Sequence, residues 1–367
     1  MMDYLYGSLK VLESAARPLT RGERLRASEG PLLSWYERNK RLLPWREEPE
    51  PYRVWISEIM LQQTRVEAVK PYFARFMAAL PDIEALARVE EETLLKLWEG
   101  LGYYNRARNL QKAAVRIMEE FGGHMPDSYE KILSLPGIGS YTAGAVSSIA
   151  FGIAEPAVDG NVLRVLARLF NDSEEINRDS VKKKAEQLIR EQMPKERPGD
   201  YNQALIELGA IVCLPNGKPL CGSCPLNSLC LARREGTEEL LPVKAAKKPR
   251  KIEERTVFLL EWEDRTAIRQ RSSKGLLASL YEFPNVLGHV KREELSEVLE
   301  VGEEEILSAE PLPSSVHIFS HVEWHMIGYR VKLSRVHPGR YQMVRTEEIL
   351  EKYPLPNAFG VYTKALK

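Results

Sequence analysis

The sequence is poor in cysteine and has no excess of either charge. Only four of its 367 residues are cysteines, and they all lie within eighteen residues, at Cys213, Cys221, Cys224 and Cys230. Such clustering, in a chain that we expect in a reducing compartment, argues against disulfides and for a shared bound group. Lysine plus arginine equals aspartate plus glutamate at 52 each. Overall charge therefore gives no support to nucleic-acid binding, and any basic surface must be local.

Long apolar runs are also missing. No stretch reaches the roughly 18 uninterrupted apolar residues that indicate a membrane span, and the first residues, MMDYLYGSLKVLES, contain an early acid and no apolar core of signal-peptide type. We therefore expect no membrane association and a cytoplasmic location. Hydrophobic residues at 44% and charged residues at 28% are typical of a globular protein, and the length allows two or three domains.

The periodicity of apolar residues changes along the chain. We expect an N-terminal extension over 1–28, a helical region over 29–232 whose first helix begins at Pro31, a linker over 233–254 and an α+β domain over 255–367. The linker is indicated by VKAAKKPRKIEE, which is basic, interrupted by proline and without an apolar face. After it, TVFLLEWEDRTAIRQR predicts two strands around a Glu-Asp turn, and HVEWHMIGYRVKL predicts another strand.

The segment from Leu135 to Phe170 carries the densest functional signals. Its first half predicts a helix, a Pro-Gly-x-Gly turn and a second helix, and the backbone N–H groups around Gly137 and Gly139 could bind a phosphate. Its second half places Asp159 at the N-cap of a further helix, twenty residues after Gly139. Each half alone is more often an ordinary turn or an ordinary cap. Their pairing, followed by the cysteines, favours a functional site.

The cysteines follow the pattern Cys-x7-Cys-x2-Cys-x5-Cys. Four thiolates can bind either a zinc ion or a cubane iron–sulfur cluster. Zinc ribbons and fingers usually pair two Cys-x2-Cys knuckles, and this chain has one, so the spacing favours a [4Fe–4S] cluster.

The order of these motifs resembles that of helix-hairpin-helix DNA base-excision glycosylases, and VWISEIMLQQTRV resembles their MutY branch, the adenine DNA glycosylases, almost residue by residue. The resemblance covers residues 29 to 365. It implies a multidomain protein: a two-lobed, all-α catalytic region with an iron–sulfur loop over 213–230, and a C-terminal α+β Nudix-like domain. The family has six residues in the first cysteine gap where this chain has seven. The cluster would tether a loop that carries Lys218 near a DNA phosphate.

The resemblance also implies an activity. It predicts a monofunctional enzyme, acting as a monomer on double-stranded DNA, that excises adenine mispaired with 8-oxoguanine or guanine. Cleavage of the N-glycosidic bond needs a protonated acid for the leaving base and an ionised carboxylate for the sugar cation. Glu58 falls on the family's general acid, although an acid among apolar helix residues more often faces solvent. We expect apolar surroundings to raise the pKa of Glu58 and the helix N-terminus to keep Asp159 ionised.

Tyr141 distinguishes this chain from the bifunctional endonuclease III relatives. In those enzymes the same position of the hairpin is the lysine that forms a Schiff base and nicks the strand. The resemblance implies that Tyr141 and Asn161 position Asp159 and the sugar. A packing role for Tyr141 is equally compatible with the sequence.

Base recognition requires that the adenine leave the helix and that the gap be filled. Gln63 and Tyr103 match the family's wedge positions. The oxidised guanine would be read by Phe319, Ser320 and His321, although strict strand alternation would turn Ser320 to an apolar face unless the strand ends before it. The remaining base-binding positions implied by the family are Leu43, Trp45, Arg46, Thr64 and Gln203.

Three other interpretations stay open. An endonuclease III-like glycosylase with lyase activity on oxidised pyrimidines is disfavoured by Tyr141. A noncatalytic iron–sulfur DNA-binding protein is disfavoured by the pair of Glu58 and Asp159. A Nudix pyrophosphatase is disfavoured because the stretch from Arg292 to Glu297 keeps only fragments of the metal-binding acid box.

Overall fold

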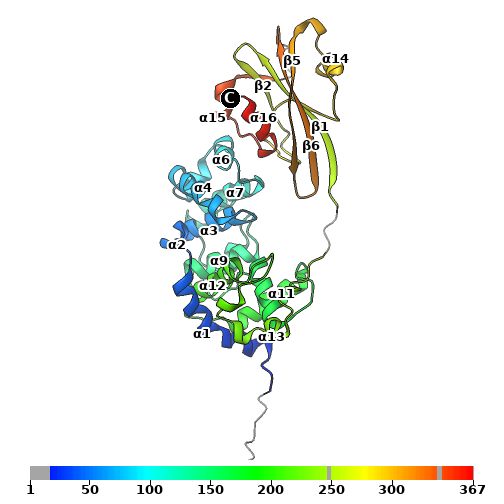
Figure 1. The fold of residues 1–367 in the computed structure, drawn as a ribbon. Coiled ribbons are helices and arrows are strands. Elements are labelled where there is room, and N and C mark those ends of the chain that lie inside the picture. The colour runs from blue at the N-terminus through cyan, green and yellow to red at the C-terminus, as the bar shows by residue number, and fades with distance from the viewer. Residues whose placement is uncertain (1–16, 246–248, 337–340, 367) are drawn as a thin grey trace, which may run out of the picture. The chain divides into compact units, whose positions relative to one another are not determined.

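The computed structural model describes residues 17–245, 249–336 and 341–366 (Figure 1). The chain divides into two compact units. Unit 1 contains the described residues up to Arg41 together with Gly152–Lys244, and unit 2 contains Leu42–Phe151 together with the described residues from Ala245 onward. None of the helices in these described ranges is long and apolar enough to cross a membrane.

Unit 1 is helical, and its core forms where α10 packs against α12 and α12 packs against α1. The first helix, expected to begin at Pro31, begins at Arg21 instead. The reason is a capping box, in which Thr20 accepts from the backbone of Glu23 while the Glu23 carboxylate accepts from the backbone of Thr20. Buried Leu25 and Leu32 hold this helix against the core on both sides of Pro31. The helices are α1 (Arg21–Asn39), α10 (Gly160–Phe170), α11 (Asp179–Gln192), α12 (Pro198–Ile211) and α13 (Leu231–Glu235), with short 3-10 turns η1 (Cys221–Ser223) and η2 (Asn227–Leu229).

The helical part of unit 2 encloses a second core. Trp55 and Trp98 are fully buried in it, and Phe76 packs edge-on against Trp98. The helix α3 supports both the acid predicted at position 58 and the end of the hairpin, because it packs against α4 and α9. The helices are α2 (Pro44–Glu47), α3 (Pro51–Leu61), α4 (Val66–Ala79), α5 (Ile83–Arg88), α6 (Glu91–Leu97), α7 (Asn105–Phe121), α8 (Tyr129–Leu133) and α9 (Ser140–Phe151).

The predicted hairpin joins α8 to α9. Gly137 has φ 76°, and a Cβ there would lie 2.5 Å from the Cβ of Asn109, so only glycine fits. Ile138 is 8% exposed and packs into the core as an apolar peg. Gly139 differs, because no atom would lie within 4 Å of its added Cβ. The turn therefore requires glycine at position 137 for its backbone geometry, whereas Gly139 is not restricted by neighbouring atoms.

The rest of unit 2 is a seven-stranded mixed sheet flanked by short helices. Strand order is β3-β2-β1-β6-β5, with β4 paired to β1 and β7 to β2, and β1 runs parallel to β6. The predicted strand pair around Glu263-Asp264 is confirmed, and β1 begins at Lys251 rather than near residue 255. The strands are β1 (Lys251–Trp262), β2 (Arg265–Gln270), β3 (Tyr281–Glu282), β4 (Asn285–Leu287), β5 (Ile306–Ile318), β6 (Val322–Leu333) and β7 (Gln342–Arg345). The helices are α14 (Leu295–Leu299), α15 (Thr346–Lys352) and α16 (Gly360–Ala365), with 3-10 turns η3 (Arg292–Glu294), η4 (Glu303–Glu305) and η5 (Asn357–Phe359).

The antiparallel strands β5 and β6 are joined by Phe319, Ser320 and His321. The backbone N–H of Phe319 donates to the carbonyl of Val322 at 2.9 Å and closes the turn. The strand thus ends before Ser320, which settles the alternation problem, and both Ser320 and His321 are exposed. His321 is therefore a turn residue rather than a partly buried strand histidine.

Candidate functional site

Glu58 is a buried carboxyl in the middle of α3. Its residue is 8% exposed, so it does not face solvent as acids on apolar helices usually do. The phenol of Tyr141, on the second residue of α9, donates a hydrogen bond to Glu58 Oε2 at 2.7 Å. Apolar neighbours Trp55 and Ile59 belong to the surrounding core. The Glu58 carboxyl is therefore held by a phenol at the edge of the apolar core of unit 2.

Asp159 is held in a different way, as the N-cap of α10. Its Oδ1 accepts from the backbone N–H groups of Asn161 and Val162, both at 2.8 Å, and its Oδ2 accepts from the Asn161 amide at 2.6 Å. Arg164 in turn donates to the Asn161 carbonyl oxygen at 2.8 Å. This confirms the predicted cap and fixes the direction in which the carboxylate points.

The helix N-terminus lowers the pKa of Asp159 as expected, but the net shift is upward. Burial raises the pKa of this carboxyl, and the hydrogen bonds from Val162 and Asn161 and the charge of Arg164 only partly oppose it. Part of the residue's surface remains exposed, yet the protein atoms around the carboxylate remove enough water to outweigh the helix N-terminus. Asp159 belongs to unit 1, whereas Glu58 belongs to unit 2.

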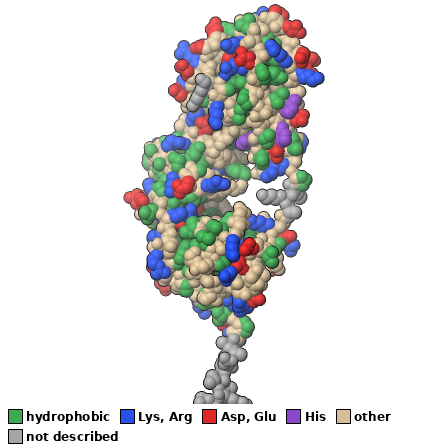
Figure 2. Space-filling view, viewed as in Figure 1, with side chains coloured by type: hydrophobic (Ala, Val, Ile, Leu, Met, Phe, Trp, Pro, Cys, Tyr) green, Lys and Arg blue, Asp and Glu red, His purple; other side chains and the backbone are tan. Residues whose placement is uncertain are grey.

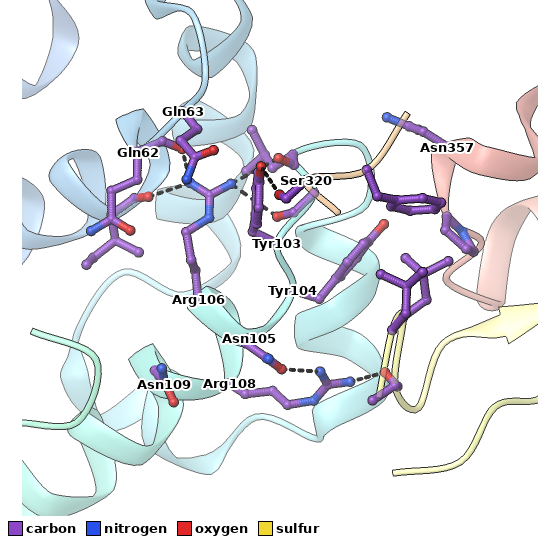
Figure 3. A pocket seen from close by; sticks show the side chains of 18 of the residues that line it. Gln62, Gln63, Tyr103, Tyr104, Asn105, Arg106, Arg108, Asn109, Ser320 and Asn357 are labelled. Atoms are coloured by element: carbon purple, nitrogen blue, oxygen red, sulfur yellow. Dashed lines mark hydrogen bonds between the residues drawn. The ribbon is translucent and has the colours of Figure 1, made fainter. Parts of the chain in front are cut away.

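The two predicted wedge residues occupy strained positions in two loops. Gln63, two residues after the end of α3, has φ 57°, and Tyr103, just before α7, has φ 48° and is 50% exposed. Non-glycine residues are uncommon in this left-handed region, and such strain tends to gather at functional sites. Both line a cavity of about 880 Å³ in unit 2 (Figure 3).

The loop between β5 and β6 lines the same cavity. Phe319 is fixed by edge-on contacts with His317 and Trp324, at ring-centroid distances of 4.6 and 4.9 Å. Ser320 Oγ lies 3.1 Å from the phenol oxygen of Tyr103 (Figure 3). Unit 2 therefore brings together the predicted wedge and the predicted reading loop. Figure 2 shows acidic and basic side chains interspersed on the visible face, in line with the balanced composition.

The four cysteines line one small cavity beside α10 and α12. Arg168 donates to Cys213 Sγ at 3.2 Å, and Arg164 donates to the Cys213 carbonyl at 2.7 Å. Burial raises the pKa of the Cys224 thiol to about 12, so a bound cation is needed to keep it a thiolate. Among the described residues no three His, Cys, Asp or Glu side chains are placed to hold a single metal ion. Four thiols around one cavity are a donor set that either a zinc ion or an iron–sulfur cluster can use.

The predicted phosphate-binding groups are available in both units. Gly139 has open space above its backbone, at the start of α9. Lys218 is exposed in the loop that separates the first two cysteines.

Comparisons with known proteins agree with this geometry. Residues 56–191 match the HhH-GPD superfamily of base excision DNA repair proteins, and residues 256–365 match the NUDIX domain. The adenine DNA glycosylase of Buchnera aphidicola subsp. Acyrthosiphon pisum is 36% identical over 82% of this chain and 85% of that protein. The chain belongs to the adenine DNA glycosylase family.

The mammalian adenine DNA glycosylases are longer than this chain. The human protein is 37% identical over 81% of this chain but 65% of its own length, and the rat protein is 36% identical over 80% and 68%. The chain thus spans about two thirds of the length of these relatives. The prediction of an adenine DNA glycosylase family member with a helical region and a Nudix-like domain is confirmed.

Solved structures of other glycosylases match more than half of the chain. A thermostable thymine-DNA glycosylase gives a TM-score of 0.54 at 30% identity, covering 58% of this chain and 97% of that one. A trapped endonuclease III–DNA covalent intermediate gives 0.52 at 27% identity, covering 60% and 99%. The fold of the covered part of this chain is thus shared with both structures.

The base-binding positions implied by the adenine DNA glycosylase family are placed less uniformly. Leu43 and Trp45 are 2% and 5% exposed, and Trp45 packs edge-on against Phe73 at 5.4 Å, so both are core residues of unit 2. Arg46, Thr64 and Gln203 are half-buried. Contact of these five residues with a base stays a prediction.

Sequence reasoning missed two buried arginines, Arg164 and Arg168, which are each 4% exposed. They face the cysteine loop from one side of α10. A signal was present, because two arginines four residues apart in an otherwise apolar helix need buried partners. It also missed Arg106, for which no such signal exists.

Proposed function

We propose that this chain hydrolyses the N-glycosidic bond of adenine mispaired with 8-oxoguanine or guanine in double-stranded DNA, and leaves an abasic site for base excision repair. The single observation that carries the proposal is the buried Glu58 carboxyl held by the Tyr141 phenol. Glu58 can act as the proton donor, and it lies beside the helix that follows the hairpin. Tyr141 occupies the position where a lyase would need the amine of a lysine. The second acid, Asp159, is held ready by its own helix.

In this mechanism Glu58 gives its proton to a ring nitrogen of the adenine. The electron pair of the C–N bond leaves with the base, and the sugar becomes a cation. Ionised Asp159 stabilises that cation until a water molecule adds to the sugar carbon, and the proton that this water loses restores Glu58 to its acid form. Asn161 keeps the Asp159 carboxylate oriented through its amide. Since Tyr141 cannot form a Schiff base, no strand cleavage follows.

The DNA is held by groups outside the chemistry. Gly137, Gly139 and Lys218 bind phosphates, and Gln63 and Tyr103 fill the space left by the extruded nucleotide. Phe319, Ser320 and His321 read the base opposite. The remaining pocket residues contact the adenine: Leu43, Trp45, Arg46, Thr64 and Gln203. The protein acts as a monomer in the cytoplasm.

The four cysteines bind a [4Fe–4S] cluster. When bound, the cluster supplies a structural cross-link for the loop over 213–230 and takes no part in base removal. Removal of the iron should abolish DNA binding and lower the thermal midpoint before it affects the chemical step. Binding that is unchanged after complete loss of the cluster's visible absorbance would contradict this role.

The test uses a labelled duplex with one adenine opposite 8-oxoguanine. Strand breaks should appear only after alkali, and borohydride should trap no covalent adduct. Breaks without alkali together with a trapped adduct would support the endonuclease III-like alternative. Binding without any release of adenine would support the noncatalytic alternative.

A further inference from the structure

Arg106, in the first turn of α7, donates hydrogen bonds to two separate loops. One of its terminal nitrogens, Nη1, bonds the end of α3, and the other, Nη2, bonds the loop before α7. Figure 3 shows the guanidinium between the segment of Gln62 and Gln63 and that of Tyr103. The acceptors are the carbonyl oxygens of Ile59 at 2.7 Å, Met60 at 3.1 Å, Gln62 at 2.8 Å, Leu101 at 2.9 Å and Gly102 at 3.1 Å.

Two of these acceptors belong to the residues directly before the strained positions. Gln62 precedes Gln63 and Gly102 precedes Tyr103, and both Gln63 and Tyr103 have positive φ. A non-glycine residue stays in that conformation only when its surroundings fix it. The backbone of Arg106 adds a further bond, because its N–H donates to the Tyr103 carbonyl at 2.8 Å. Arg106 thus fixes the backbone of the residues that precede both Gln63 and Tyr103.

The chemistry of the acceptors explains why an arginine is used. The last carbonyls of a helix have no donor within the helix and carry its partial negative charge. A guanidinium offers five N–H donors in a planar fork, so it can bond two groups of carbonyls in different directions. Burial lowers the pKa of Arg106 to about 10, which still leaves it charged at neutral pH.

Arg106 is not available to bind a phosphate. Its terminal nitrogens are occupied by the five carbonyls, and its Nε is buried without a partner among the described residues. The rings of Trp98 and Tyr103 lie 5.4 and 5.7 Å from its guanidinium carbon. A basic residue near DNA is usually expected to contact the backbone of the duplex, but this one is used inside the protein.

We propose that Arg106 is a positioning residue that holds Gln63 and Tyr103 as one two-pronged wedge, so that both side chains enter the duplex in a single step. The inference rests on the proposed glycosylase function and adds a residue to the step before the chemistry. It predicts that Gln63 and Tyr103 depend on each other through Arg106, although they come from different loops.

The test measures single-turnover removal of adenine opposite 8-oxoguanine by the full chain, with 2-aminopurine beside the adenine as a fluorescent reporter of extrusion. Arg106→Lys keeps the charge but offers three donors on one atom. We expect at least a tenfold slower fluorescence change and an equal loss in rate. Arg116→Lys is the matched control, because Arg116 lies in the same helix and pairs with Glu120 at the surface. Its rate should stay within twofold of wild type.

A mutant cycle separates positioning from general stability. In a Gln63→Ala, Tyr103→Ala background, Arg106→Lys should change the rate less than twofold, since no wedge remains to be positioned. A tenfold loss in both backgrounds would show a merely structural role and overturn the inference. If Arg106→Lys fails to fold, as judged by its thermal midpoint, Arg106→Gln takes its place in the same cycle. A wild-type chain that releases no adenine would instead overturn the proposed function on which the inference rests.

Discussion

The two carboxyl groups predicted to act in catalysis, one in each unit, are held in different ways. Asp159 begins a helix and accepts three hydrogen bonds from N–H groups, whereas Glu58 lies in mid-helix and accepts a hydrogen bond from a phenol. Both are surrounded by protein, and both accept hydrogen bonds that favour a negative charge. The difference teaches that the donors at a helix N-terminus do not by themselves decide the acidity of a carboxyl, because burial still raises the pKa of Asp159.

The largest effect should come from removing either acid. Glu58→Gln and Asp159→Asn should each lower the single-turnover rate of adenine release about 10³-fold, because acid catalysis and charge stabilisation each contribute about 10² to 10⁴. Binding of the mispaired duplex, measured by fluorescence anisotropy, should be kept. Glu67→Gln is the control, since Glu67 pairs with Lys70 on an exposed helix face. Full activity in either variant would end the assignment of that acid.

The pH dependence should distinguish the two acids. Because burial raises the pKa of Asp159, the group takes up a proton at a higher pH than an ordinary aspartate. The rate should therefore fall about tenfold per pH unit below an inflection that lies above the usual value of about 3.9. A profile of rate against pH in wild type and in Asp159→Asn would show this, because the residual rate of the variant should lack the acid limb. An acid limb unchanged in the variant would assign the inflection to another group.

The same shift has a consequence for stability. A raised pKa in the folded state means that the contribution of Asp159 is fully present below its unfolded pKa and is lost as the pH rises through the folded value. Asp159→Asn should therefore not lower the thermal midpoint at neutral pH in the way that loss of a favourable charge would.

A smaller effect should follow from removing the phenol that holds Glu58. Tyr141→Phe should slow adenine release about tenfold, because one hydrogen bond to a carboxyl contributes about 1.5 kcal/mol. Tyr52→Phe is the matched control, since the Tyr52 phenol is buried in the same helix as Glu58 but donates to the Leu80 carbonyl at 2.9 Å. Rapid-quench kinetics on both variants would compare them. Equal rates for the two would show that Tyr141 only packs the hairpin.

The smallest effect should concern the opposite base. Ser320→Ala removes one hydroxyl from the loop between β5 and β6 and should reduce the preference for 8-oxoguanine over guanine about fivefold, as expected for loss of a single hydrogen bond of about 1 kcal/mol. Val316→Ala, on the exposed end of β5, is a control for changes in that strand. The ratio of the two single-turnover rates is the measurement. A ratio that does not move would remove Ser320 from the reading loop.

Local rules predicted the parts of this molecule that depend on neighbours in sequence. The cap at Asp159, the glycine turn and the strand pair around Glu263 all follow from residues a few positions apart. The start of the first helix could not be predicted in this way. Proline is common in the first turn of a helix and so indicates Pro31, whereas no regular apolar pattern follows the capping box about ten residues earlier.

Properties that depend on distant residues could not be obtained in that way. Burial raises the pKa of Asp159, while its hydrogen bonds and Arg164 lower it. Which effect is larger depends on how the whole chain folds around the carboxyl, and the sequence shows only the helix N-terminus. Arg106 and Arg108 look alike in the sequence. Only the fold shows that Arg106 bonds five carbonyls while Arg108 pairs with Glu91.

The two glycines of the hairpin serve as separate probes of the protein. A methyl group at position 137 collides with Asn109, whereas one at position 139 meets no protein atom. Deep mutational scanning should therefore separate the two positions. Replacement of Gly137 should reduce the amount of folded protein, whereas replacement of Gly139 should leave abundant protein that binds nucleic acid more weakly.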